Sequence, residues 1–123
     1  MNEFAVYDSD LANLISNADI VGVVNNCSMT TDEQLKHISE ENLADIISCC
    51  FGVSESSHNI LEALSMLHMG YANNDVITYL KPNEFLKFAS EITSLLGSVN
   101  NCLTYLLSSS YHLQNAKNAS LSN

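Results

Sequence analysis

The chain has 123 residues, a mass of 13.5 kDa and fourteen Asp and Glu against four Lys with no Arg, so its formal net charge is −10. This length is typical of one domain, and 46% apolar residues are enough to form a core. Nucleic acid and anionic membranes are excluded as direct partners, because binding to either one requires many basic side chains.

The acidic charge is concentrated in the first half of the chain. Residues 1–62 contain eleven carboxylates and one lysine, whereas residues 63–123 contain three carboxylates and three lysines. Such an asymmetry between halves indicates an interaction surface. A solvated face that keeps a small protein in solution explains the same pattern, and both interpretations stay open at this level.

The N-terminal elements are expected to be short. Residues 4–7 favour an edge strand, and residues 20–24 are β-branched enough for a second strand or a buried connection. Between them, Asp8 or Ser9 starts a helix as its N-cap residue. The apolar stripe of this helix consists of Leu11, Leu14, Ile15 and Ala18. A loop over residues 25–29 follows.

The middle of the chain predicts two helices. Thr30 and Glu33 have the spacing of a capping box, which starts a short helix that carries Leu35 and Ile38. Ser39 starts the next helix, which is expected to end at Phe51 and Gly52. Its inward side is predicted to consist of Leu43, Ile46, Ile47 and Cys50.

The C-terminal half predicts two or three further helices. Ser57 is expected to cap a helix whose apolar residues recur at helical spacing from 60 to 71. Residues 76–80 favour a short strand, and Pro82 stands where a helix accepts proline, in its first turn. Gly97 is expected to close this helix before a last one begins at Ser98.

These elements predict a mainly α fold, a compact bundle of five or six helices with two or three short strands, and an α+β fold is the alternative. Residues 1–114 are assigned to a single domain, and residues 115–123 to a polar tail that frays.

Catalytic and metal-binding motifs are sparse. The four histidines, His37, His58, His68 and His112, stand alone, and no pair of cysteines has the spacing of a zinc site. We therefore expect no metal, no cofactor and no catalytic residue. A thiol-dependent enzyme that uses Cys27, Cys49 or Cys50 remains the minor alternative.

The cellular compartment is predicted from the N-terminus and the cysteines. The acidic start of the chain lacks the positive region of a signal peptide. Cys49 and Cys50 are adjacent, which suits buried reduced thiols better than a disulfide framework. We expect a cytoplasmic protein in which the four cysteines are buried.

Recognition of another protein is the function that these observations favour. Five carboxylates, proposed as the partner-binding residues, cluster around one lysine on two consecutive predicted helices: Asp32, Glu33, Glu40, Glu41 and Asp45. Such a patch steers a basic partner, for example a nuclease toxin or another nucleic-acid-binding protein, into a complex. The hypothesis is a small acidic cytoplasmic inhibitor of the immunity-protein type.

A dimeric secretion chaperone or scaffold for an effector protein is the second hypothesis. The chain has no Asp, Glu, Lys or Arg between Glu91 and Lys117. In this hypothesis residues 92–111 form the surface through which a homodimer assembles.

Three segments resemble the bacterial YfbM-like family of unknown function. They are an N-terminal strand that runs into residues 8–15, the amphipathic residues 60–67 and the segment 76–86, in which Leu80-Lys81-Pro82 opens a helix after a short strand. The match covers less than half of the chain, and the family's tryptophan in the middle helix is missing. The resemblance implies an α+β fold and leaves the function open.

Overall fold

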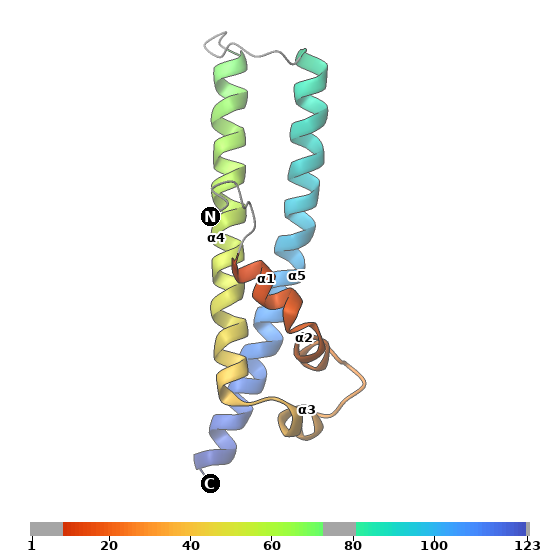
Figure 1. Cartoon of the computed structure of the whole chain (residues 1–123), viewed down its shortest axis with the longest axis vertical. Coiled ribbons are helices and arrows are strands. Elements are labelled where there is room, and N and C mark those ends of the chain that lie inside the picture. Colours follow the sequence, from red (N-terminus) through yellow and green to blue (C-terminus); the bar gives the residue numbers. More distant parts are fainter. Residues whose placement is uncertain (1–8, 73–80, 123) are drawn as a thin grey trace, which may run out of the picture. The chain divides into compact units, whose positions relative to one another are not determined.

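The computed structural model describes residues 9–72 and 81–122, and their regular structure is helical (Figure 1). The helices are, in chain order, α1 (Ser9–Ser16), α2 (Ala18–Val24), α3 (Thr31–His37), α4 (Glu40–Ala72) and α5 (Pro82–Ser122). The predicted mainly α fold is therefore confirmed. The strands expected at residues 4–7 and 76–80 lie outside the described residues.

The strand considered for residues 20–24 is wrong, because these residues form most of α2. Asn17 joins α1 to α2 directly: its backbone N–H donates to the Asn13 carbonyl at 3.1 Å, and its own carbonyl accepts from Val21 at 3.0 Å. β-Branched residues lower helix propensity by only a fraction of a kcal/mol each. The hydrogen-bonded junction and the burial of Val24, which is 3% exposed, outweigh that preference.

Both predicted helix starts in the middle of the chain are confirmed. Thr30 and Glu33 form the reciprocal capping box of α3, in which each side chain accepts a backbone N–H of the other residue. The Ser39 hydroxyl accepts the N–H of Asn42 at 3.0 Å at the start of α4. These bonds satisfy N–H groups that the first turn of a helix leaves without an intrahelical partner.

The helix end expected at Phe51 and Gly52 is wrong, because α4 runs on for 33 residues in total. One glycine inside a helix costs about 1 kcal/mol, which is less than the gain from burying apolar residues on both sides of it. Ser57, expected as a cap, lies inside α4 and is 2% exposed.

Helix α5 begins at Pro82 as predicted, but it also continues past Gly97, to a length of 41 residues. The polar segment that was expected to fray after residue 114 is helical through Ser122. Lys117 anchors it, since its ammonium group donates to the Ile38 carbonyl at 2.7 Å. The assignment of residues 1–114 to a single domain stays a prediction.

Both long helices carry residues at seven-residue intervals that face a helical partner. We call Leu43, Cys50, Ser57 and Leu64 the inner series of α4, and all four are at most 9% exposed. The inner series of α5 is buried or half-buried and consists of Phe85, Ile92, Val99, Leu106 and Leu113. Such a repeat is typical of helices that pack along a shared seam.

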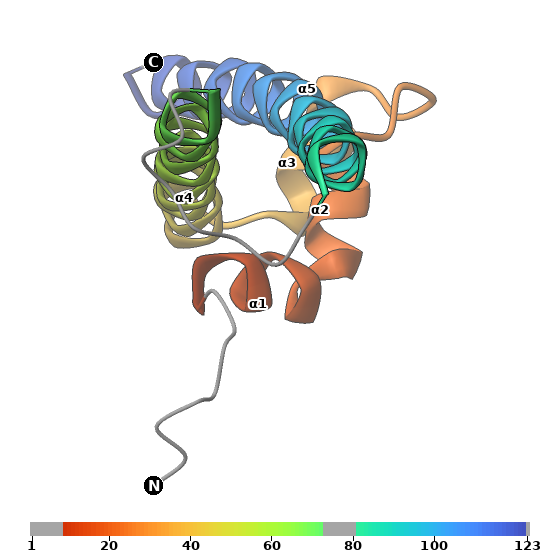
Figure 2. The same cartoon turned by 90° about the horizontal axis from the view of Figure 1, so that it is seen from above.

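The described residues divide into two compact units, of which unit 1 contains residues 1–53 and 103–123. In unit 1, the start of α1 lies beside α4, where Asp10 meets Gly52 (Figures 1 and 2). Gln34, buried in α3, donates from its side-chain nitrogen to the carbonyls of Val23 and Val24 at 2.8 and 3.2 Å. These bonds hold the end of α2 against α3.

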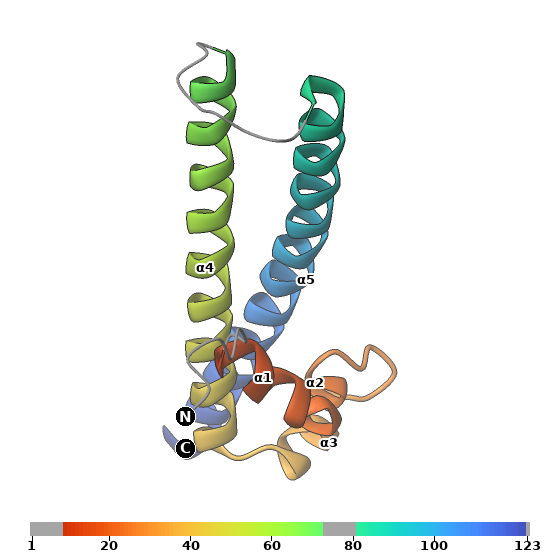
Figure 3. The same ribbon diagram turned by 45° about the horizontal axis from the view of Figure 1, so that its top comes forward.

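Unit 2 contains residues 54–102, which include the later turns of α4 and the first turns of α5. The two helices run antiparallel, side by side (Figures 1 and 3). His68 stacks on Phe85 with ring centroids 6.1 Å apart, which fixes the register of the pair. Among the described residues, no helix is long and apolar enough to span a membrane.

Candidate functional site

The five predicted partner-binding carboxylates all belong to unit 1 and are all exposed. Asp32 and Glu33 lie in the first turn of α3, and Glu40 and Glu41 in the first turn of α4. Negative charge at these positions favours the helix, because the N-terminal end of a helix carries a partial positive charge. Their position therefore has a structural reason besides any role in binding.

Asp45 and Asp32 line two different pockets. Asp45 lines a pocket between α1 and α4, whereas Asp32 lines a shallower one beside Lys36 and Lys117. The pocket of Asp45 has no basic residue in its lining, whereas that of Asp32 has two.

The pocket of Asp45 has a volume of about 390 Å³, and we call it the acidic pocket. Its second carboxylate comes from α1, which the sequence did not single out for binding. The lining residues are Asp10, Asn13, Leu14, Asn17 and Ile20 on the α1–α2 side, and Asn42, Asp45, Ile46, Ser48 and Cys49 on α4. Two carboxylates and three carboxamides thus line one hollow, and the ten residues contain no Lys, Arg or His.

A glycine permits this close approach of α1 to α4. A Cβ atom built on Gly52 would collide with the side-chain carboxylate of Asp10. Any other residue at this position therefore forces the Asp10 side chain to move. The glycine that was expected to end a helix instead allows Asp10 to reach the acidic pocket.

The negative charge of the acidic pocket affects the pKa of the Cys49 thiol, which lines the pocket. Burial raises the pKa of its thiol above that of an ordinary cysteine, and the negative charges of Asp10 and, more weakly, Asp45 raise the pKa further, while a hydrogen bond with Asn13 opposes them. The field in the pocket thus disfavours an anion. Burial also raises the pKa of Cys50, to about 11. Both thiols are therefore protonated at neutral pH, which makes them poor nucleophiles.

The sequence contains a spacing pattern that corresponds to this site. Asp10, Asn13 and Asn17 are spaced by three and four residues, and so are Asn42, Asp45 and Cys49. Each trio therefore lies on one face of its helix. The sequence could not show that α1 and α4 turn these two faces toward each other, because that depends on packing at Gly52.

A second pocket of about 380 Å³ lies beside the loop between α2 and α3. There the Tyr105 hydroxyl and the Cys27 sulfur are 3.1 Å apart, and this hydrogen bond raises the pKa of Tyr105. His112 lines the same pocket and hydrogen-bonds the Thr31 hydroxyl at 3.4 Å. The prediction that all cysteines are buried is wrong for Cys27 and Cys102, because both thiols are exposed.

In this second pocket, no hydrogen bond joins Cys27 to His112 among the described residues. The recorded hydrogen bonds of Cys27 join it to Tyr105 and to the carbonyl of Asn25, and that of the His112 ring leads to Thr31. A nucleophilic cysteine needs a base within hydrogen-bond reach. Within residues 9–72 and 81–122, no group of three or more His, Cys, Asp or Glu side chains is placed to hold a metal ion.

Comparison with known proteins adds no relative. No family model, no curated protein and no solved structure matches the chain. The resemblance to the YfbM-like family stays a prediction, and the described residues show no strand that would support the α+β fold it implies.

Proposed function

We propose that this protein binds a basic protein partner and that its acidic pocket receives a cationic side chain of that partner. One observation carries the proposal: Asp10 and Asp45 line a single hollow together with three carboxamides and no basic residue. Carboxylate and carboxamide oxygens are acceptors for the N–H groups of a guanidinium or ammonium group. Arginine fits best, because its planar group donates several hydrogen bonds at once.

The net negative charge of unit 1 supports long-range electrostatic attraction of a basic partner. The residue ranges of unit 1 contain nine carboxylates and two lysines, whereas those of unit 2 contain five and two. A surface of one dominant sign accelerates encounter with an oppositely charged partner, and this effect weakens as salt is added. The exposed Asp32, Glu33, Glu40 and Glu41 contribute in this way, without direct contact in the pocket.

The class of partner follows from this charge. Proteins that bind or cleave nucleic acid present lysine and arginine in their clefts, and an acidic protein seated on such a cleft blocks it. We therefore propose a non-enzymatic inhibitor of the immunity-protein type that works without a cofactor. Four free thiols accord with a cytoplasmic location, because the cytosol keeps thiols reduced.

A defined probe tests the pocket. The full chain, labelled with ¹⁵N, is titrated with a capped tetra-arginine peptide at low salt, and amide shifts are followed by NMR. We expect shifts in residues 10–20 and 42–49, and weaker binding at 200 mM than at 50 mM NaCl. Replacing both pocket carboxylates, Asp10→Asn with Asp45→Asn, should weaken binding roughly ten-fold, from about 1 kcal/mol or less per removed ion pair.

The matched control removes the same charge elsewhere. Glu55 and Glu62 are exposed acids on the α4 turns of unit 2. The double variant Glu55→Gln with Glu62→Gln should bind the peptide within about two-fold of the wild type. Equal losses in both double variants would show that only net charge attracts the peptide, and the proposed role of the pocket would then be wrong.

A further inference from the structure

Asn17, which lines the acidic pocket, has a side chain that does not act as its position would suggest. It stands at the N-cap of α2, where the side-chain oxygen of an asparagine ordinarily accepts a backbone N–H of the first turn. The Asn17 side chain makes no such bond. Its nitrogen instead donates to the Asn13 carbonyl at 2.8 Å. The side chain is therefore turned back along α1, and its oxygen caps no helix.

This bond determines which end of the carboxamide stays open. A backbone carbonyl only accepts hydrogen bonds, so the nitrogen of the Asn17 side chain has to lie against it, and the reversed carboxamide would bring two oxygens together. Among the described residues, the side-chain oxygen of Asn17 has no hydrogen-bond partner. Because Asn17 is exposed and lines the pocket, this oxygen is open to a donor from another molecule.

The carboxamide of Asn13, one turn earlier on α1, is held in a similar way. Its hydrogen bond to Cys49 lowers the pKa of that thiol. A bond with this effect favours the thiolate, so the Asn13 nitrogen donates to the sulfur. Two carboxamides of the acidic pocket thus use their nitrogens within the protein. The groups that they leave for a ligand are acceptors, as are the carboxylates of Asp10 and Asp45.

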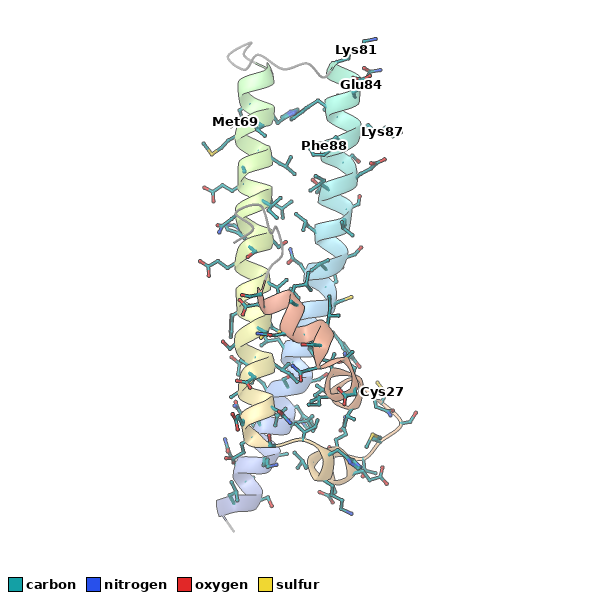
Figure 4. The ribbon with its side chains drawn as sticks, in the orientation of Figure 1. Cys27, Met69, Lys81, Glu84, Lys87 and Phe88 are labelled. Atoms are coloured by element: carbon teal, nitrogen blue, oxygen red, sulfur yellow. The ribbon has the colours of Figure 1, made fainter. Side chains whose placement is uncertain are left out.

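The chain itself supplies no cation to these acceptors. It contains no Arg and four lysines, and none of the lysines lines the acidic pocket. Lys36 and Lys117 line a different pocket of unit 1. Lys81 and Lys87 lie at the start of α5, in unit 2 (Figure 4). The cation that pairs with the acidic pocket therefore has to come from another molecule.

We propose that Asn17 makes the acidic pocket selective for a guanidinium over an ammonium group, so that the partner inserts an arginine and not a lysine. This selection rests on the proposed function, because it concerns the same pocket. The carboxylates of Asp10 and Asp45 attract either cation. The Asn17 oxygen adds a neutral acceptor on the α1–α2 side, and only one of the two cations gains much from it.

The two cations differ in how their donors are arranged. A guanidinium group spreads its N–H donors over a plane, so that it bonds a carboxylate and a carboxamide oxygen at the same time. An ammonium group carries all its donors on one strongly hydrated nitrogen. A neutral oxygen compensates poorly for the water that such a nitrogen gives up. Removal of the Asn17 oxygen should therefore weaken arginine binding and leave lysine binding nearly unchanged.

Asn17→Ala is a suitable variant, because the fold does not depend on this side chain. The Asn13 carbonyl keeps its bond from the backbone N–H of Asn17 at 3.1 Å. The side chain caps no helix, and alanine has the higher helix propensity. The melting temperature and the circular dichroism spectrum should therefore stay close to those of the wild type. A changed ligand preference in this variant reports a lost contact and not a lost fold.

Two probes of equal charge, capped tetra-arginine and capped tetra-lysine peptides, test the selection. Each is titrated into the full ¹⁵N-labelled chain at about 50 mM NaCl. The wild type should bind tetra-arginine about five-fold more tightly, the effect of one hydrogen bond. Asn17→Ala should reduce this preference to within about two-fold. Asn101→Ala, which removes an exposed asparagine from the unit 2 turns of α5, should keep it.

A tetra-arginine peptide with dimethylated guanidinium groups separates hydrogen bonding from charge, because methylation keeps the charge and removes donors. The wild type should bind it as weakly as tetra-lysine. Equal binding of all three peptides, or an arginine preference that survives in Asn17→Ala, would show that Asn17 selects nothing. If Asp10→Asn with Asp45→Asn still weakens binding in that case, the acidic pocket remains a cation site. If no peptide shifts the amides of residues 42–49, both proposals are wrong.

Discussion

The two units bury equivalent positions of α4 to very different extents. Three residues after the inner series lie Ile46 and Val53 in unit 1, which are 4% and 5% exposed, and Ile60 and Leu67 in unit 2, both 46% exposed. The inner series itself is buried in both units. One series of α4 is therefore buried by a single helical partner, and the other is buried only in the unit that has a further layer.

The further layer in unit 1 is supplied by the short helices. Helix α1 lies against the turns of α4 that hold Ile46 and Cys49, and Gly52 lets it approach closely. Unit 2 has two helices and no third element among its described residues. The comparison shows that an amphipathic helix needs neighbours on more than one side to bury a wide apolar stripe.

The largest expected effect tests this difference directly. Ile46→Ala should lower the free energy of unfolding by about 2–4 kcal/mol, because it leaves a cavity in a closed core. Ile60→Ala should lower it by about 1 kcal/mol at low micromolar concentration, because half of that side chain is in water already. Urea denaturation followed by circular dichroism measures both, and equal losses would contradict the difference in burial.

Two glycine substitutions, one in each unit, test the comparison with stability changes of intermediate size. Gly52→Ala should destabilise the chain by about 1–2 kcal/mol, because its methyl group displaces the Asp10 side chain from its place over α4. Gly97→Ala in unit 2 meets no atom within 4 Å and should stabilise the chain by about 0.5–1 kcal/mol through helix propensity.

Thermal denaturation of both glycine variants is the measurement, and a double variant locates the cause. Asp10→Ala in the Gly52→Ala background should recover part of the lost stability, since it removes the colliding carboxylate. If Gly52→Ala proves as favourable as Gly97→Ala, α1 does not depend on the glycine for its approach to α4.

The smallest expected effect concerns two buried serines. In unit 1 the Ser110 hydroxyl donates to the Leu106 carbonyl at 2.7 Å, whereas the Ser57 hydroxyl in unit 2 has no hydrogen-bond partner among the described residues. Ser57→Ala should stabilise the chain by about 1 kcal/mol, because a buried hydroxyl without a partner carries a desolvation cost. Ser110→Ala should change stability by about 0.5 kcal/mol or less.

Chemical denaturation at a single concentration suffices for the two serine variants. A loss of stability in Ser57→Ala would mean that its hydroxyl is hydrogen-bonded in solution, for instance to a buried water. That result would remove one of the two differences between the units and leave the difference in burial intact.

Local signals in the sequence predicted where most helices begin. Thr30, Ser39 and Pro82 act within one turn of their own positions, so their effects need no knowledge of the rest of the chain. The inward positions Leu43, Ile46, Ile47 and Cys50 were also predicted correctly, because period alone places them on one side of a helix.

Helix ends were predicted poorly for a physical reason. Gly52 and Gly97 lower helix propensity locally, but α4 and α5 continue through them because the residues on both sides are buried along a shared seam. Residues 20–24 form a helix for the same kind of reason. The stabilisation from their burial exceeds the small loss of helix propensity that their β-branched side chains cause. Energies from packing exceed the local preferences that a sequence displays.

The sequence by itself determined the mainly α class, the starts of α3, α4 and α5, and the concentration of negative charge. Only the tertiary structure decided which carboxylates share a pocket: it joined Asp45 to Asp10, and it left Asp32 beside Lys36 and Lys117. The physical reason is that the charge of a segment and the helical spacing of its apolar residues are properties of that one segment. A pocket is a property of two segments whose distance apart is set by packing, and here the Asp10 side chain of one segment fills the space left by Gly52 of the other.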